Sequence, residues 1–222
     1  MKILKTIARW IFILSIPLFS LSFAINQEFS TAWFYTRGFK EHNVSMQTGL
    51  SEEELDKVAD KFVEYFNSSE QRIHITFGDW QTALFTKDEV THFEDVKGLV
   101  IFDRRIMLGS LGVMLLGIIW WQRRNWQTLG KSLLAGGILT AVLLVLVIVA
   151  AATNFDWLFL QFHLLSFNNN YWYSDGYMTD LFPHQFWYDM AMFTILITAA
   201  TAAVIGGAGY ILMRLTGKKE ND

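Results

Sequence analysis

Two histidines stand in segments whose residue types favour acid–base chemistry. His92 lies in the sequence VTHFEDVK, and His163 lies in FHLLSFNNNYW. Because the ordinary pKa of histidine is close to neutral pH, an imidazole can take up and return a proton under physiological conditions. The chain contains no cysteine, which excludes a thiolate nucleophile, a cysteine-ligated metal and a disulfide. The two histidines are therefore the candidate catalytic pair.

The residues around His92 predict how its ring is held. Thr86 and Glu89 have the spacing of a capping box, which predicts the start of a short helix that carries His92. Glu89, His92 and Asp95 share one face of such a helix, so a carboxylate can orient the imidazole and favour its cationic form. A surface histidine in a charged helix is the alternative interpretation.

The surroundings of His163 are aromatic. Of the 36 residues in 154–189, 13 are aromatic, and none is lysine or arginine. Part of this set is expected to form an interfacial aromatic belt, and the rest to wall an apolar chamber at the level of the lipid headgroups. Such a chamber suits an amphiphilic substrate with acyl chains in the bilayer. The side chains that offer hydrogen bonds inside it are Asn168, Asn169, Asn170, Asp175 and Asp180.

The elements that must position both histidines are membrane helices. Each of four apolar runs is long enough to cross about 30 Å of hydrocarbon as a helix, which satisfies its own backbone there. The predicted fold class is an all-α membrane protein with four transmembrane helices and a small, mainly helical extracellular cap. The predicted spans are 1–25, 106–122, 132–153 and 190–213.

Lysine and arginine set the expected orientation. They precede the first apolar run and occur in the loop at 123–131 and the tail at 214–222, so the positive-inside bias places these segments and both termini in the cytoplasm. The cap at 26–105 and the aromatic-rich segment at 154–189 are then extracellular, and both histidines lie at the outer interface. A cleaved signal peptide at 1–24 is the alternative for the first run, and it would leave both outer segments unchanged.

Two further patterns concern the cap. Ser51 and Glu54 form a second capping-box pattern, and the apolar residues from Leu55 to Phe66 recur with helical spacing, which predicts an amphipathic helix. The alternation at 73–77 suggests a short strand. The remaining histidines have no recognisable partner spacing and are interpreted as structural or surface residues: His42, His74 and His184.

Several classes of function lack support in the sequence. The net charge of −3 argues against a nucleic-acid partner. The chain has no HExxH zinc helix, no phosphate-cradling glycine loop and no GxSxG elbow. Two histidines with nearby acids could hold a metal, but no spacing demands one. We therefore expect neither a metal nor a cofactor, and the sequence does not determine the oligomeric state.

Three motifs carry a family resemblance. The segment TGLSEEEL, the pattern ExxHxxDVK and the pattern FHxxxFxNxxW, together with the four spans, resemble the bacterial lipoprotein intramolecular transacylases over nearly the whole chain. Members often carry Asp-Pro after the tryptophan, whereas here Asp175 precedes Gly176. The resemblance implies catalysis by His92 and His163. The residues it implies for substrate binding are Glu89, Asp95, Lys97, Phe162, Phe167, Asn169, Trp172 and Asp175.

The resemblance also implies a reaction, partners and a location. The sn-2 acyl chain of a diacylglyceryl group would move to the α-amine of the N-terminal cysteine of a lipoprotein in the bacterial cell membrane. The expected partners are a diacylated lipoprotein and membrane lipids. His163 is favoured as the base and His92 as the charge-stabilising partner, although the sequence does not assign these roles. An ester hydrolase and a non-enzymatic sensor or scaffold are the alternatives.

Overall fold

A computed structural model describes residues 2–77, 82–122 and 125–218. The chain forms two compact units, each built from segments distant in the sequence. We call them the membrane unit, which comprises residues 1–24, 103–153 and 194–222, and the cap unit, which comprises residues 25–102 and 154–193. Arg123, Arg124 and residues 219–222, which belong to the predicted cytoplasmic segments, lie outside the described residues.

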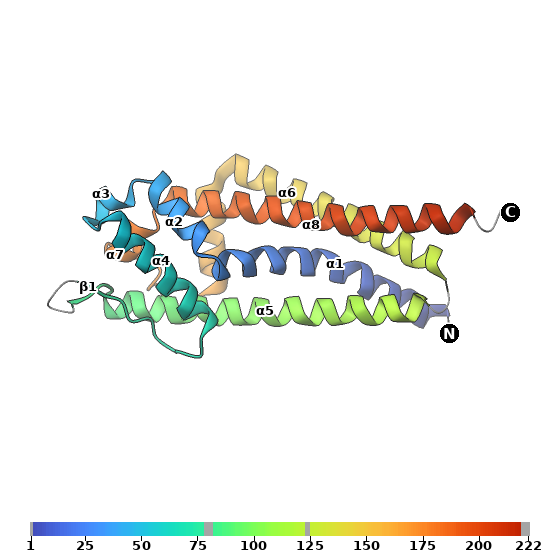
Figure 1. Cartoon of the computed structure of the whole chain (residues 1–222), viewed down its shortest axis with the longest axis horizontal. Helices are drawn as coiled ribbons and strands as arrows, with labels where there is room; N and C mark the ends of the chain where they lie inside the picture. The colour runs from blue at the N-terminus through green and yellow to red at the C-terminus, as the bar shows by residue number, and fades with distance from the viewer. Residues whose placement is uncertain (1, 78–81, 123–124, 219–222) are drawn as a thin grey trace. The chain divides into compact units, whose positions relative to one another are not determined.

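Helices account for nearly all the regular structure of the described residues (Figure 1). The two strands form one short antiparallel hairpin, in which Thr76 pairs with Ala83. In chain order the elements are α1 (Lys2–Ser30), α2 (Ala32–Glu41), α3 (Val44–Thr48), α4 (Glu52–Asn67), β1 (Thr76–Phe77), β2 (Thr82–Ala83), α5 (Lys87–Gln122), α6 (Trp126–Ser166), α7 (Tyr177–Leu181) and α8 (His184–Lys218).

Three helices of the described chain are long and apolar enough to cross a membrane: α1, α6 and α8. This agrees with the predicted helical membrane protein. The fourth predicted span, 106–122, occupies the second half of α5 and stays a prediction.

Glycines allow close helix contacts in the membrane unit. A Cβ atom on Gly130 would lie 2.8 Å from the carbonyl oxygen of Gly209, and one on Gly209 would lie 2.7 Å from the carbonyl oxygen of Gly130. Contacts this short require glycine on both helices, as in other membrane bundles where small residues bring backbones together. Gly117 likewise faces the ring of Phe12 on α1.

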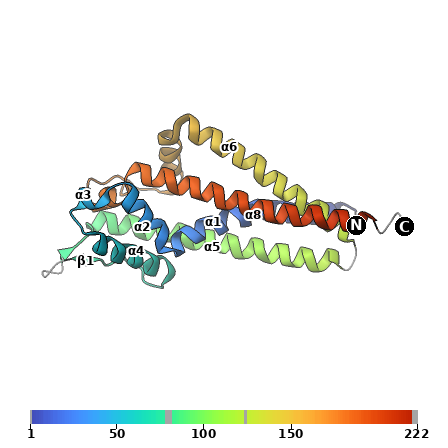
Figure 2. The ribbon, with the colours of Figure 1, turned by 45° about the horizontal axis from the view of Figure 1, so that its top comes forward.

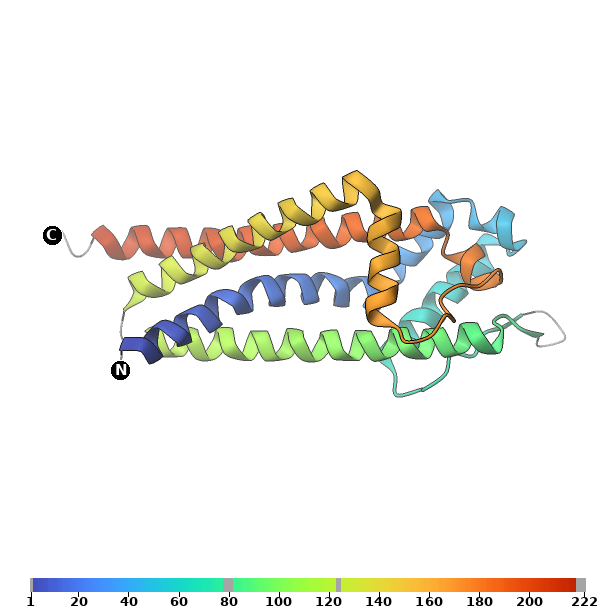
Figure 3. The ribbon, with the colours of Figure 1, turned by 180° about the vertical axis from the view of Figure 1, so that it is seen from behind.

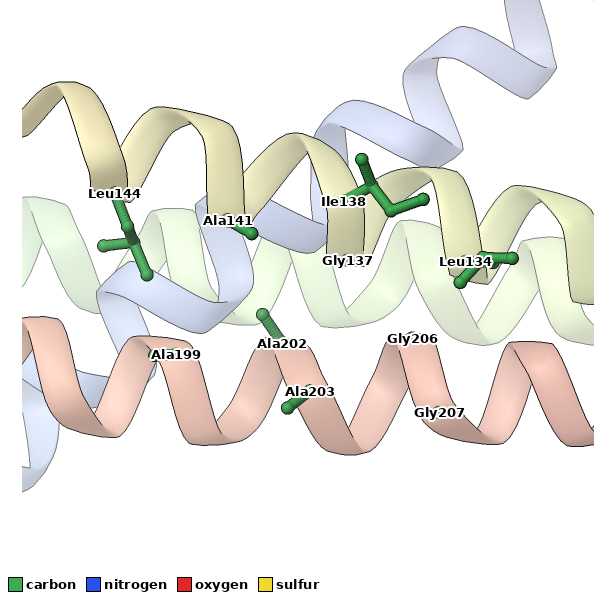
Figure 4. Close-up of a pocket in the computed structure, with 10 residues that line it drawn as sticks. All are labelled: Leu134, Gly137, Ile138, Ala141, Leu144, Ala199, Ala202, Ala203, Gly206 and Gly207. Carbon is green, nitrogen blue, oxygen red and sulfur yellow. The ribbon is translucent and has the colours of Figure 1, made fainter.

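An apolar pocket opens where α6 and α8 separate. Within the membrane unit, α6 diverges from α8 along its course toward residue 153 (Figure 2). The pocket has a volume of about 270 Å³ and lies between small side chains of both helices (Figure 4). Its lining comprises Leu134, Gly137, Ile138, Ala141, Leu144, Ala199, Ala202, Ala203, Gly206 and Gly207.

An aromatic core holds the cap unit together. The ring of Phe62 on α4 contacts those of Tyr35 on α2 and Phe182 after α7, with centroid distances of 5.8 and 5.0 Å. The amphipathic helix predicted after Ser51 is confirmed, because its apolar face is buried and Ser51 forms the capping box with Glu54. Of the strand suggested at 73–77, only Thr76–Phe77 is a strand.

The helix that carries His92 is longer than predicted. The short helix expected after Thr86 is the first part of α5, which runs for 36 residues without interruption. No proline occurs between Lys87 and Gln122, so nothing in the backbone chemistry ends the helix before the predicted span. The cap and the predicted span are therefore continuous along one helix.

The segment that carries His163 begins as a helix, although we expected a loop from residue 154. α6 continues to Ser166 as two helical stretches joined at Asn154, whose φ and ψ of −163° and 89° are not helical (Figure 3). The side-chain oxygen of Asn154 accepts a hydrogen bond from the backbone nitrogen of Trp157 at 2.9 Å. Asn154 therefore acts as an N-cap for a second helical stretch, residues 154–166.

Candidate active site

The first turn of α5 fixes the start of the helix that bears His92. The backbone nitrogen of Thr86 donates to Oε2 of Glu89 at 2.8 Å, and the backbone nitrogen of Glu89 donates to Oγ1 of Thr86 at 3.3 Å. This reciprocal pair is the predicted capping box. It places His92 about one turn into the helix.

Glu89 also ties α5 to the segment before α7. Its Oε1 accepts hydrogen bonds from Oγ of Ser174 and from the backbone nitrogen of Met178, both at 3.0 Å. A Cβ atom on Gly176 would lie 2.4 Å from the same oxygen, so glycine is required there. Glu89 is fully buried, and both of its oxygens are occupied by protein donors. Both oxygens therefore hold the start of α5 against the segment before α7, and the predicted contact of Glu89 with substrate stays a prediction.

His163 lies on the second helical stretch of α6 and is oriented by its own helix. Its Nδ1 lies 2.8 Å from the carbonyl oxygen of Phe159. A carbonyl can only accept a hydrogen bond, so Nδ1 carries the proton of the neutral ring. The lone pair is then on Nε2, which leaves that nitrogen able to act as a base.

The structure brings the two predicted catalytic histidines together in the cap unit. Their ring centroids are 6.1 Å apart, with an angle of 25° between the ring planes. Each residue is only 7% exposed. At this separation, one reacting group between the rings can come within hydrogen-bond reach of a nitrogen on each.

Aromatic side chains enclose the pair. The ring centroid of Phe167 lies 4.9 Å from that of His92 and 5.6 Å from that of His163. The ring centroids of Trp172 and Phe162 lie 5.0 and 5.4 Å from that of His163. Three of the residues proposed for substrate binding therefore line the histidines. Phe162 is the most exposed of the three and lies at the edge of the site.

Both histidines favour the neutral form. The pKa of His92 is lowered to about 4, mainly by burial and also by the neighbouring His163, while Asp95 acts in the opposite direction. Burial also lowers the pKa of His163, although the hydrogen bond to Phe159 acts in the other direction. The expected stabilisation of a cationic His92 by carboxylates is therefore wrong, because desolvation outweighs the charge of Asp95.

His92 has a buried nitrogen without a partner. Among the described residues, no group forms a hydrogen bond with its Nδ1, and that atom is inaccessible to solvent. A buried, unpaired polar atom typically costs about 1–3 kcal/mol. Neither Glu89 nor Asp95 orients this ring by a hydrogen bond, because their recorded partners are other groups.

Asp95 and Asn169 hold the turn that follows α6 against α5. Nδ2 of Asn169 donates to Oδ2 of Asp95 at 2.8 Å, and Oδ1 of Asn169 accepts from the backbone nitrogen of Tyr171 at 3.1 Å. This contact joins the two motifs, since Asp95 follows His92 by one turn and Asn169 lies between Phe167 and Trp172. The pair positions the walls of the site.

Lys97 serves the packing of the cap unit. Its Nζ donates to the carbonyl oxygens of Tyr65 and Glu70, both at 2.5 Å, and lies 4.2 Å from the ring centroid of Tyr65. The side chain is buried at the end of α4, where a cation complements the last carbonyls of a helix. These contacts show a structural role for Lys97, and its predicted contact with substrate stays a prediction. Asp175 is exposed, and its predicted substrate contact stays a prediction.

Two histidine–carboxylate pairs were missed by the sequence. Nε2 of His42 lies 2.9 Å from Oδ2 of Asp189, and Nε2 of His184 lies 2.8 Å from Oδ1 of Asp156. Both carboxylates lie in 154–189, and the first pair is separated by 147 positions, so local spacing contained no signal. The ring of His184 also packs 5.5 Å from that of Phe159, the residue that binds Nδ1 of His163.

These features define a class of protein: a helical membrane protein with a pair of neutral, buried histidines in an aromatic site. Among the described residues, three or more metal-ligating side chains do not gather at any point. The arrangement can move protons at a reacting group, and it offers no cysteine nucleophile.

Comparison with known proteins identifies the family. The family model described as lipoprotein intramolecular transacylase Lit matches residues 10–187. The chain belongs to this family of acyltransferases. An uncharacterized protein of Aquifex aeolicus (strain VF5) is 31% identical over 117 residues, which are 51% of this chain and 51% of that protein. The chain thus spans about half the length of this curated relative.

Solved structures show the same fold. The membrane integral lipoprotein intramolecular transacylase Lit from Bacillus cereus superposes with a TM-score of 0.86 at 20% identity and 100% coverage of both chains. A variant of that protein with one histidine replaced by arginine gives a TM-score of 0.81 at 20% identity, covering 99% of this chain and 95% of its own. At this identity, the superpositions are informative about the fold alone.

Proposed function

We propose that this protein transfers the sn-2 acyl chain of a diacylglyceryl group to the α-amine of the N-terminal cysteine of the same lipoprotein, giving lyso-form lipoprotein. Family membership supports acyl transfer. The observation that carries the mechanism is the pair of buried histidine rings 6.1 Å apart. Conversion of an ester into an amide is favourable, so the reaction needs no activated donor.

In this proposal His163 is the general base. The α-amino nitrogen attacks the ester carbonyl carbon and gives its proton to Nε2 of His163, the nitrogen left with a lone pair by the bond from Nδ1 to Phe159. An α-amino group has a pKa of about 7.7–8.0, so a substantial fraction of it is deprotonated near neutral pH. Collapse of the tetrahedral intermediate breaks the bond to the glyceryl oxygen, which takes the proton from Nε2 of His163 and becomes the free hydroxyl of the lyso-form product.

His92 is proposed to donate a hydrogen bond to the developing oxyanion or to the leaving oxygen. A neutral ring keeps one N–H, and a donor in a water-poor site stabilises developing charge more than it would in water. The unpaired Nδ1 supports this role, because the ring is not committed to a carboxylate that would fix its tautomer.

The aromatic walls are proposed to supply orientation. Phe167 and Trp172 pack directly on the histidine rings and leave little space for alternative placements of a substrate. Holding an ester and an amine of one molecule in near-attack geometry can contribute about 7–11 kcal/mol in favourable cases. Exclusion of water from the same space would suppress hydrolysis of the ester.

For the membrane arrangement we propose four spans, with the second half of α5 as the fourth member. Both termini would be cytoplasmic, and the histidine pair would lie at the extracellular interface of the bacterial cell membrane. The distribution of lysine and arginine supports this orientation. In the cysteine-free chain, Asn170→Cys should react with an impermeant thiol reagent added from outside.

Tandem mass spectrometry of a reporter lipoprotein tests the function. Acyl migration preserves total mass, so fragments of the N-terminal peptide must place the acyl chain on nitrogen when the protein is present. Release of free fatty acid without N-acylation would identify an ester hydrolase instead. An unchanged lipid at the reporter would indicate a sensor or scaffold.

A further inference from the structure

The second helical stretch of α6, residues 154–166, has one face in the cap unit. Phe155, Phe159 and His163 follow one another at four-residue spacing and pack on neighbouring rings. His163 is 7% exposed. This face is therefore fixed by the protein.

The other face is apolar and exposed. Trp157 is 56% exposed, Leu160 40%, Leu164 57% and Leu165 91%. Trp157, Leu160 and Leu164 recur at three- and four-residue spacing, so they form a stripe along one side of the helix. Asp156 is the only charged residue between 154 and 166. In water, such a stripe would leave a large apolar surface uncovered.

The chain around this stripe indicates what covers it. α6 passes from its membrane-unit stretch into residues 154–166 through Asn154 alone, so no soluble linker separates them. The preceding stretch contains the most hydrophobic window among the candidate spans, with a mean hydropathy of 2.9, and that window is only 11% buried. Its exposed side chains, such as Leu146 and Val149, require lipid around them. The exposed apolar surface thus continues along the chain directly from a lipid-facing span.

We propose that the stripe Trp157, Leu160 and Leu164 is embedded in the lipid leaflet at which the span of α6 ends. Helices of this kind lie with their apolar face about 5–10 Å into the boundary between headgroups and acyl chains. Tryptophan is enriched at that boundary. The partner of this surface is therefore the bilayer.

The proposal links lipid contact to the active site. Leu164 follows His163 directly, so one helix presents a lipid-facing stripe and a catalytic ring about a quarter turn apart. The bilayer thereby holds His163 against the cap unit. This second step rests on the proposed function, whereas the lipid contact does not.

Site-specific fluorescence tests the lipid contact without any assay of activity. The chain has no cysteine, so Leu160→Cys and Leu164→Cys each introduce a single labelling position. Val145→Cys in the span is the lipid-exposed control, and Asp60→Cys on the polar face of α4 is the water-exposed control. The labelled full-length chains are reconstituted in phosphatidylethanolamine–phosphatidylglycerol vesicles.

We expect labels at 160 and 164 to be quenched several-fold more by a doxyl group on carbon 5 of a phospholipid than the label at 60. Iodide in the buffer should show the opposite order. Quenching of the 164 label like that of the 60 label would overturn the proposal. Protection from both quenchers would also overturn it, because another protein surface, such as a second copy, would then cover the stripe.

A charge pair tests the link to catalysis. Leu160→Glu/Leu164→Glu should lower N-acylation about 10-fold or more at equal protein level, because small displacements of a reacting group are costly. Met46→Glu places a charge at an exposed apolar position on α3 and should leave activity unchanged. Wild-type activity of the double variant would overturn the positioning step. Absence of N-acylation by the wild type would refute the proposed function and leave the quenching result intact.

Discussion

Four histidines of the cap unit fall into two kinds that differ in their partners. His42 and His184 each lie within 3 Å of an aspartate oxygen, at 2.9 and 2.8 Å. His92 and His163 form no such pair and are surrounded by aromatic rings and by each other. Burial among apolar groups favours the neutral imidazole at His92 and His163.

This difference in partners indicates that the two pairs of histidines have different roles. The rings of His42 and His184 each contact an aspartate from another part of the sequence. His42 and Asp189, for example, are 147 positions apart. The rings of His92 and His163 lie next to each other and are not paired with a carboxylate. Both therefore remain able to exchange a proton with a substrate. We therefore predict that His42 and His184, each beside an aspartate, are structural, and that His92 and His163 are the reactive pair.

The largest effect should come from replacing the neutral pair. We expect His92→Gln and His163→Gln each to reduce N-acylation by about 10²–10⁴-fold, because general acid–base groups contribute on that scale. The double variant should be little worse than the worse single variant, since members of one unit are strongly non-additive. Tandem mass spectrometry of the reporter peptide measures the rate.

The ion-paired histidines supply the matched controls for this experiment. His42→Gln and His184→Gln should remain near wild-type activity, and all four variants must insert and extract normally. Near-normal N-acylation by either variant of the neutral pair would remove that residue from the mechanism. Equal losses in all four would mean that the division between the two kinds of histidine is wrong.

The second effect concerns Glu89, the buried acid three residues before His92. Glu89→Gln should lower the free energy of unfolding by about 3 kcal/mol, because a buried carboxylate that accepts several hydrogen bonds is replaced by a group with one acceptor oxygen. Activity should fall roughly 10- to 100-fold as α5 shifts. Thermal unfolding and the peptide assay measure the two effects. Glu94→Gln, a partly exposed acid on the same helix, is the control and should change neither.

Glu89 also shows how far the sequence alone could predict the site. Its bond to Thr86 spans three residues and was predicted from the capping-box spacing. Its bonds to Ser174 and Met178 span 85 and 89 residues, so no local pattern contained them. The histidine motifs were recognisable because each is a short continuous run of sequence: the first lies on α5, and the second begins at the end of α6 and continues into the turn that follows it. The carbonyl partners of Lys97 lie 32 and 27 positions away in the sequence, so no local pattern predicted them either.

A third, smaller effect should come from Asp95. Asp95→Ala leaves the amide of Asn169 without its acceptor, and we expect about a 10-fold loss of activity because the wall of the site loosens. Asp95→Asn keeps an oxygen acceptor and should stay within a few-fold of wild type. This ordering revises the sequence-based expectation that the charge of Asp95 orients His92. Equal losses in both variants would show that the charge itself is required, and steady-state N-acylation rates distinguish the outcomes.

The smallest expected effect concerns the pH dependence of the N-acylation rate, which should show no break between pH 7 and 5. This measurement tests whether His92 and His163 are neutral. Between pH 7 and 5 the deprotonated fraction of an α-amine with a pKa of about 7.7–8.0 falls about tenfold per unit, so the logarithm of the rate should fall with a slope near one. The histidines add nothing to this slope while they remain neutral. Burial lowers the pKa of His92 to about 4 and lowers that of His163 as well, which moves their protonation to more acid pH and extends the active range downward. If a required histidine had its ordinary pKa of about 6.5, its protonation would lower the rate about a further tenfold at pH 5.5.

Initial rates of N-acylation across this range, with folding verified at each pH, measure the slope. A steepening from one toward two near pH 6.5 would contradict a neutral, desolvated pair, whereas His184→Gln should reproduce the wild-type profile because that ring takes no part in the reaction.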